Sequence, residues 1–238
     1  MSHKMNRRAI GRMMALVGVG GVFVGSCLFL ARHYDELGAC ARDVAEMRLA
    51  CESLRAGSNL LSLQVTRYVI TGDVEARDAY FREAKKIRHR EEAFSILSRV
   101  RDAATVERRL RVAMTLSLEL MQMEYHAMRL MTDDKGLASA PPEVQGCRLT
   151  DEELCVTFAE RQRRARLEVL GDGYDAYKQR IYRALEDAME GVIAYAETRA
   201  VHGWAMLVAF NVLAGACLLV FGAAFGCAMT SRRLRGQA

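Results

Sequence analysis

The chain has 238 residues, of which 51% are hydrophobic and 26% charged, with two prolines and one tryptophan. This composition favours an all-helical protein with few domains. All 29 acidic residues and 26 of the 34 basic ones lie between His33 and His202, so this middle segment is net negative although the whole chain carries +5. A nucleic-acid binder concentrates basic charge in its folded part, and the pattern therefore argues against that class.

Two uncharged apolar segments lie near the ends, Met13 to Ala31 and Gly203 to Thr230. Each is long enough to cross a hydrocarbon core of about 30 Å. Lysine and arginine flank the outer side of both, which predicts that both termini are cytoplasmic. The predicted domains are a cytoplasmic N-terminus at 1–12, transmembrane helices at 13–31 and 203–230, an extracytoplasmic domain at 32–202 and a cytoplasmic tail at 231–238.

The first apolar segment has a second interpretation as a removable signal, because boxes ending in Cys27 and Cys40 resemble bacterial lipoprotein cleavage sites. Leu28 to Ala31 continue the apolar run after the first box, and charged residues precede the second. We therefore expect the segment to be retained as a membrane helix. Each span contains a GxxxG pattern, Gly21 with Gly25 and Gly222 with Gly226. Such glycines either let two helices approach closely or are ordinary membrane-helix residues.

A long apolar stripe follows the first span. Steps of three and four residues keep side chains on one narrow face of a helix, the seam that a coiled coil or bundle buries. The stretch runs from Leu37 to Asp73. Gly72 stands where a helix C′ glycine belongs, and Asp73 can cap a following helix that has Glu75 in its first turn. A chain reversal is expected there. The seam positions are Leu37, Cys40, Val44, Met47, Cys51, Leu54, Ser58, Leu61, Val65 and Tyr68.

Between Val74 and Lys135 there is neither glycine nor proline. One helix of that length would overshoot the opening helix, so we place a turn at Arg99 to Thr105 and expect helices over 74–101 and 103–132. The second of these is apolar nearly all round, which indicates burial on more than one side. Residues 133–150, which contain two glycines and two prolines, are expected to form a loop.

Thr150 and Glu153 form a capping-box pattern that predicts another helix, interrupted at Gly171. From Tyr174 to Tyr195 apolar residues again step by three and four, and this last helix is expected to run directly into the second span. The helices expected at 74–101, 103–132 and 174–202 have nearly equal lengths. The fold class predicted is all-α, an antiparallel four-helix bundle anchored by two transmembrane helices.

Three stretches strengthen a family resemblance: Arg67 to Asp73 with Tyr80 downstream, Leu116 to Met128, and Leu170 to Tyr182. Together with the two spans they resemble the extracytoplasmic four-helix-bundle sensor domain of methyl-accepting chemotaxis receptors and related sensor kinases and diguanylate cyclases. The resemblance implies a periplasmic sensor domain for signal transduction. Those families continue into a HAMP linker and an output module, which this sequence does not contain. It is then either a sensor half that works through a partner or a truncated reading frame.

No CxxCH, CxxC or HExxH pattern, phosphate loop or nucleophile elbow occurs, so we expect no enzyme activity, no cofactor and no metal site. His126 among Met121, Met123 and Met128 is expected to be core rather than a metal ligand. Basic clusters at 82–90 and 161–166 either hold an anion or are solvated helix faces; neighbouring glutamates favour the second. The predicted ligand contacts are Arg67 and Tyr68, near the distal end where, by resemblance, such receptors bind small anions.

Four cysteines lie outside the spans, where disulfides are permitted. Cys40 and Cys51 are about 16 Å apart on one helix and cannot pair with each other. They either pair across a symmetric dimer or are buried small residues, and we favour burial. Cys147 and Cys155 are candidates for a local disulfide.

The function expected is that of a membrane-bound sensory protein of the bacterial inner membrane. It would form a homodimer through its first helix, bind an unknown small ligand or periplasmic protein, and relay that event through the second span. The alternative is a non-sensing membrane scaffold whose external helices bind another envelope protein.

Overall fold

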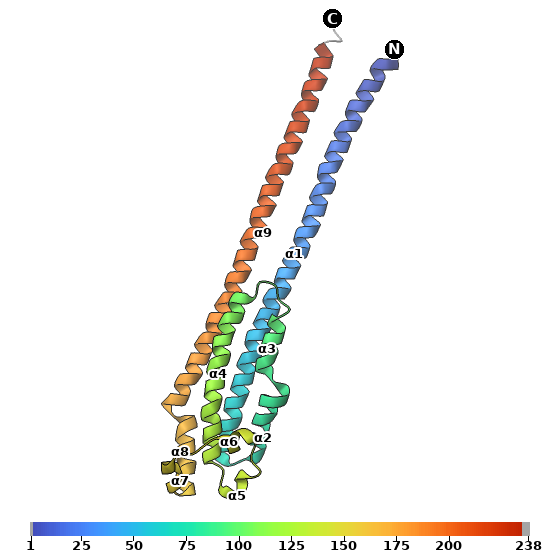
Figure 1. Cartoon of the computed structure of the whole chain (residues 1–238). Coiled ribbons are helices and arrows are strands. Elements are labelled where there is room, and N and C mark those ends of the chain that lie inside the picture. The colour runs from blue at the N-terminus through green and yellow to red at the C-terminus, as the bar shows by residue number, and fades with distance from the viewer. Residues whose placement is uncertain (1, 235–238) are drawn as a thin grey trace. The chain divides into compact units, whose positions relative to one another are not determined.

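The computed structural model describes the backbone of residues 2–234 and the side chains of residues 17–133, 135–220, 222 and 223. The protein is all-α over this range, as predicted. Part of the predicted tail at 231–238, the contacts of Gly226 and the side chain of Cys227 lie outside the described residues. The elements (Figure 1) are α1 Ser2–Thr71, α2 Val74–Arg82, the π-helix η1 Glu83–Ile87, α3 His89–Leu97, α4 Ala104–Leu130, α5 Asp134–Leu137, α6 Pro142–Gly146, α7 Asp151–Cys155, α8 Phe158–Leu170 and α9 Asp172–Leu234.

The chain divides into two compact units. The core unit comprises residues 43–195, and the terminal unit comprises residues 1–42 and 196–238. The external domain predicted at 32–202 is thus wider than the core unit at both ends. Helices α1 and α9 contribute to both units.

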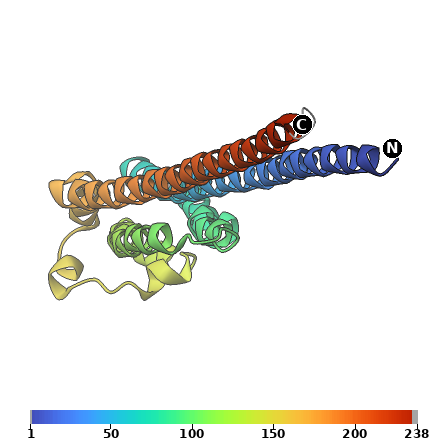
Figure 2. The ribbon, with the colours of Figure 1, turned by 90° about the horizontal axis from the view of Figure 1, so that it is seen from above.

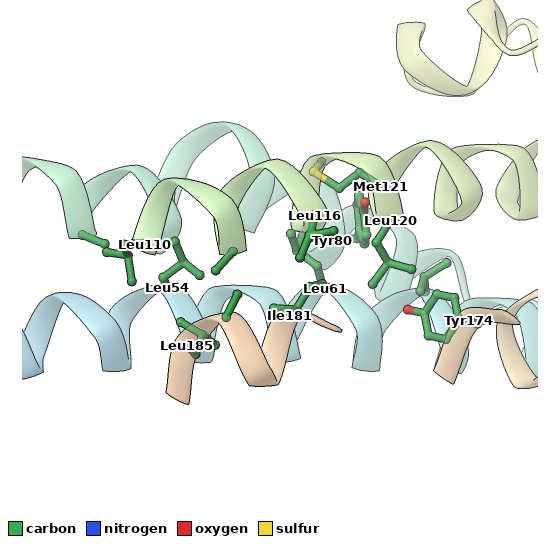
Figure 3. Close-up of a cluster of buried hydrophobic side chains, with 14 of the residues drawn as sticks. Leu54, Leu61, Tyr80, Leu110, Leu116, Leu120, Met121, Tyr174, Ile181 and Leu185 are labelled. Atoms are coloured by element: carbon green, nitrogen blue, oxygen red, sulfur yellow. The ribbon is translucent and has the colours of Figure 1, made fainter. Parts of the chain in front are cut away.

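The predicted seam of α1 is buried within the core unit. Figure 3 shows Leu54 and Leu61 of α1 among side chains of α4 and α9. At the near end of the seam the prediction was wrong, because Leu37 is 46% exposed and Cys40 is only half-buried. Both lie in the terminal unit, where only α1 and α9 are present to cover an apolar face. The buried seam positions are Met47, Cys51, Leu54, Ser58, Leu61, Val65 and Tyr68.

Helix α4 is covered on several sides, since it packs against α3, α6 and α8. Its buried apolar residues include Leu110, Leu120 and Met128. The coverage is less complete than predicted, because Val112 and Leu118 are exposed.

The reversal after α1 is confirmed. Gly72 has φ +72°, a conformation that glycine adopts without strain. Its amide donates to the Tyr68 carbonyl at 2.7 Å. The Asp73 carboxylate then accepts from the Glu75 amide at 2.9 Å and begins α2. This local chemistry is what the sequence pattern indicated.

The single helix predicted over 74–101 was wrong, because the chain breaks between α2 and α3. The π-helix η1 ends at Ile87, and the next residue, Arg88, has φ 61°. The buried Glu83 carboxylate accepts from the His89 amide at 3.1 Å and contacts the His89 ring at 2.9 Å, so it caps α3. Gly57 of α1 leaves room for the start of α3 to lie close to α1. A Cβ at this position would lie 2.9 Å from Arg90 Cγ and 3.2 Å from the Arg90 amide nitrogen.

The turn predicted at 99–105 is confirmed, since α3 ends at Leu97 and α4 begins at Ala104. The expected loop at 133–150 contains the short helices α5 and α6. The Thr150–Glu153 capping box forms as predicted, but its helix ends at Cys155, and α8 starts anew with Thr157 as its cap. The interruption at Gly171 and the continuous helix from there are also confirmed.

In the terminal unit α1 and α9 lie side by side, as Figures 1 and 2 both show. Phe29 stacks on Phe210 at 4.1 Å between ring centroids, and His33 packs against Gly203. Most other apolar side chains of this unit are exposed, including Trp204 at 71%. Both helices contain a stretch long and apolar enough to cross a membrane, judged by length and composition alone.

We expect Gly57→Val to destabilise the core unit by about 1–3 kcal/mol, because the added carbons must displace the start of α3. Gly173→Val is the matched control, since nothing lies within 4 Å of a Cβ at that glycine. Urea unfolding of the full chain in detergent, followed by circular dichroism, measures the difference. Equal stability of the two variants would show that the approach at Gly57 is not tight.

Candidate functional site

The most unusual feature of the core unit is a buried carboxylate that joins four helices. Glu124 of α4 is 1% exposed. One carboxylate oxygen accepts from the Tyr80 hydroxyl of α2 at 2.6 Å. The other accepts from the Tyr174 hydroxyl of α9 at 2.7 Å and from the Ser62 hydroxyl of α1 at 3.3 Å. We call these four residues the Glu124 hub; Figure 3 shows Tyr80 and Tyr174 within the apolar cluster.

The electrostatics of the hub follow from its burial. Burial raises the pKa of Glu124, while the hydrogen bonds from Tyr174, Tyr80 and Ser62 and the nearby Arg90 charge lower it and offset part of that rise. Burial beside Glu124 also raises the pKa of Tyr80 and of Tyr174. Both phenols therefore keep their protons and act as donors to the carboxyl group.

A second polar layer lies two helical turns along α4. Arg90 of α3 is 2% exposed and donates to the Ser117 hydroxyl at 3.0 Å. Ser117 is also 3.0 Å from the Ser58 hydroxyl of α1. Because buried polar groups are costly unless they are paired, these bonds specify which faces of α1, α3 and α4 meet.

An open groove of about 710 Å³ lies between α1 and α9 in the core unit. This size falls within the range of roughly 300–1,000 Å³ that small-molecule sites occupy. Leu185 and Met189 supply an apolar part, and Glu186 and Glu190 supply carboxylates. At one place the two helices are tied by a hydrogen bond from the Tyr182 hydroxyl to Asn59 at 2.8 Å.

The two predicted ligand contacts have different surroundings. Arg67 is 58% exposed in its side chain and pairs with Asp73 at 2.6 Å, which ties the end of α1 to the start of α2. Tyr68 is 6% exposed and packs in the core. Neither lines the groove. A role for them in ligand binding stays a prediction.

Cys147 and Cys155 are free thiols in the structure, one half-buried and one exposed, and a bridge between them stays a prediction. Cys51 is buried, and this burial raises its pKa to about 11. Within the described residues no group of three or more histidines, cysteines and acidic residues is arranged to hold a metal ion.

Some residues of each basic cluster pair with glutamates. Lys85 lies 2.8 Å from Glu143, and Arg163 lies 2.7 Å from Glu160. Arg90 differs from the rest of its cluster because it enters the core. The pairs made by Lys85 and Arg163 are partly or largely exposed, and exposed ion pairs contribute little stability.

Sequence reasoning missed Glu124, Ser62 and Arg90 as a functional group. The available signal was a glutamate within a helix that is apolar nearly all round, seven residues after Ser117 on the same face. Tyr80 entered the sequence analysis only as part of the family resemblance, and Tyr174 only as part of the resemblance and of an apolar helical pattern.

Comparison of the chain with protein-family models, with curated proteins and with solved structures gave no match.

We expect Tyr174→Phe to lower the free energy of unfolding by about 1–3 kcal/mol, because it leaves a buried carboxyl group short of one donor while keeping the ring. Tyr182→Phe is the control on the same helix, since its hydroxyl bonds to Asn59 in an exposed position. We expect that variant to lose less than about 1 kcal/mol. Urea unfolding of the full chain compares the two, and equal losses would contradict a special role for the hub.

Proposed function

We propose that the chain is a sensory protein of the bacterial cytoplasmic membrane. In this proposal residues 32–202 form an antiparallel four-helix bundle outside the membrane, and α9 relays ligand or partner binding through residues 203–230. The observation that carries the proposal is the continuity of α9, one helix from Asp172 to Leu234. It holds Tyr174 of the buried hub and also contains the apolar stretch, so a shift of the helix at the hub has a direct path along its axis.

Membrane anchoring is supported by the exposed apolar surface of the terminal unit. Phe23 is 68% exposed, Leu28 67%, Val212 67% and Leu219 76%. Soluble proteins rarely expose contiguous apolar surface of this extent, and lipid is the environment that would cover it. The basic residues outside both apolar stretches place the termini in the cytoplasm in this proposal.

The bundle is supported by the way four helical segments share one core. Buried residues come from α1, from α2 with α3, from α4, and from α8 with α9. Short turns at Gly72 and at 98–103 join the first three segments, which is typical of antiparallel neighbours.

A homodimer through α1 is supported by a second stripe on that helix, which we call the outer stripe. Leu49, Ala56, Leu63 and Ile70 recur every seven residues and are all exposed. The predicted seam is used within the core unit, so the outer stripe is the face of α1 left for a second copy. Residues seven positions apart lie on one face of a helix, so a second helix can cover these four together.

A scaffold is the second candidate function, and one observation favours it. Leu154, Leu167 and Leu170 on α7 and α8 are each more than half exposed. An envelope protein with an apolar surface could dock there without any small ligand.

The sensor proposal predicts ligand stabilisation. The full chain in nanodiscs is screened by thermal unfolding against amino acids, small carboxylic acids and amines. A ligand at a hundredfold excess over its Kd stabilises by about 2.7 kcal/mol, which raises Tm by several degrees. Arg67→Ala and Glu186→Gln then test the predicted contact and the groove separately. If no compound shifts Tm and one envelope protein co-purifies in fixed ratio, the scaffold is correct.

The dimer predicts a position-specific crosslink. Under mild oxidation in membranes, Leu63→Cys should give a disulfide-linked dimer above the background of the unchanged chain, because the outer stripes of two copies face each other. Val112→Cys is the control, an exposed apolar position on α4. Gel electrophoresis without reductant measures both, and equal crosslinking at the two positions would refute the α1 interface.

A further inference from the structure

His126 lies near the end of α4 and contacts two other helices. Its Nδ1 atom is 2.9 Å from a carboxylate oxygen of Glu168 on α8. Its Nε2 atom is 3.3 Å from a carboxylate oxygen of Glu153 on α7. The imidazole is 26% exposed and the carboxylates 21% and 13%, so the three groups are largely shielded from water.

This geometry selects one protonation state of the ring. A neutral imidazole has a single N–H and one lone pair, and here the lone pair would face a carboxylate oxygen. The imidazolium has two N–H groups and donates to both glutamates. Consistent with this, the hydrogen bond that His126 donates to Glu168 raises the pKa of His126, with Glu153 adding to the rise and burial opposing it.

Glu153 also holds α7 together. It accepts from the Thr150 amide at 2.8 Å, and its own amide donates to the Thr150 hydroxyl at 3.3 Å. Helix α7 has five residues and none of them is buried. Such a short helix is not stable alone, so its position against α4 depends on the contact between Glu153 and His126.

We propose that protonated His126 holds α7 against α4 through its contacts with Glu153 and Glu168, an arrangement that we call the clasp. Loss of this proton as the pH rises then releases the segment from Cys147 to Thr157. This behaviour holds whether or not the chain is a sensor. It would make the accessibility of the Cys147 thiol depend on the surrounding pH, because that half-buried thiol lies near Glu153 and Glu168.

Charged groups lie near the ring on each of the three helices that meet there. Glu153 faces it from α7 and Glu168 from α8, while Arg129 of α4 is bonded to the Thr132 carbonyl at 3.1 Å. Arg164 of α8 pairs with Glu152 of α7 at 3.0 Å. That pair ties α7 to α8 and contains no histidine, so the pH-dependent contact is the one to α4.

The direction of the pH dependence follows from the different proton affinities of the folded and unfolded chain. The folded chain holds the His126 proton more tightly than the unfolded chain, whose histidine has its ordinary pKa near 6.5. The clasp therefore contributes fully below about pH 6.5 and is lost as the pH rises through the raised pKa of the folded state.

Hydrogen exchange with mass spectrometry on the full chain in nanodiscs tests the proposal. After correction for intrinsic rates, peptides within 147–157 should be roughly fivefold less protected at pH 8.5 than at pH 5.5. In His126→Gln the peptides within 147–157 should show the same low protection at both pH values. The protection of peptides within 113–121 should not change with pH. Glu168→Gln, which leaves the capping box intact, should also lower protection at pH 5.5.

Equal protection of the unchanged chain at the two pH values would overturn the clasp. So would a His126→Gln variant that keeps the full pH dependence. If His126→Gln loses protection throughout α4 as well, the variant is misfolded. Glu168→Gln then serves as the test, and unchanged protection of residues 147–157 at pH 5.5 in that variant would overturn the clasp.

Discussion

The core unit depends on how one buried carboxyl group is satisfied. Glu124 lies in an apolar interior of low dielectric constant, where an unpaired carboxyl group would be strongly destabilising. Its donors come from α1, α2 and α9, so the group is stable only when three other helices stand at the correct height and rotation. Apolar packing alone tolerates slippage between helices, whereas this arrangement does not. The polar layer of Arg90, Ser117 and Ser58 adds the same kind of constraint for α3.

The features that could be predicted from the sequence are those with local causes. Gly72 with Asp73, and Thr150 with Glu153, end or begin helices through contacts a few residues away, and the buried part of the α1 seam, from Met47 to Tyr68, follows from its period. The break before α3 could not be predicted, because Glu83 caps it only where Gly57 of another helix leaves room. The hub was missed for a related reason. A glutamate in a helical pattern normally indicates a solvated position, and only the fold brings Tyr80 and Tyr174 to Glu124.

The proposed relay and the proposed clasp use different parts of the core unit. The hub fixes α9, the helix that contains the second apolar stretch. The clasp fixes α7, a five-residue helix with no core of its own. Because α7 has no buried residue whereas the helices around Glu124 carry the buried core, we expect α7 to open more easily than those helices. This division allows the pH response to occur without loss of the register that the hub maintains.

The placement of the aromatic residues makes the two units separately visible to spectroscopy. The only tryptophan, Trp204, lies in the terminal unit and is largely exposed, whereas seven of the eight tyrosines lie in the core unit. Indole emission therefore reports the environment of the terminal unit alone, and its wavelength distinguishes lipid from water without any label. Tyrosine absorption comes mostly from the core unit, so a single unmodified sample records both units.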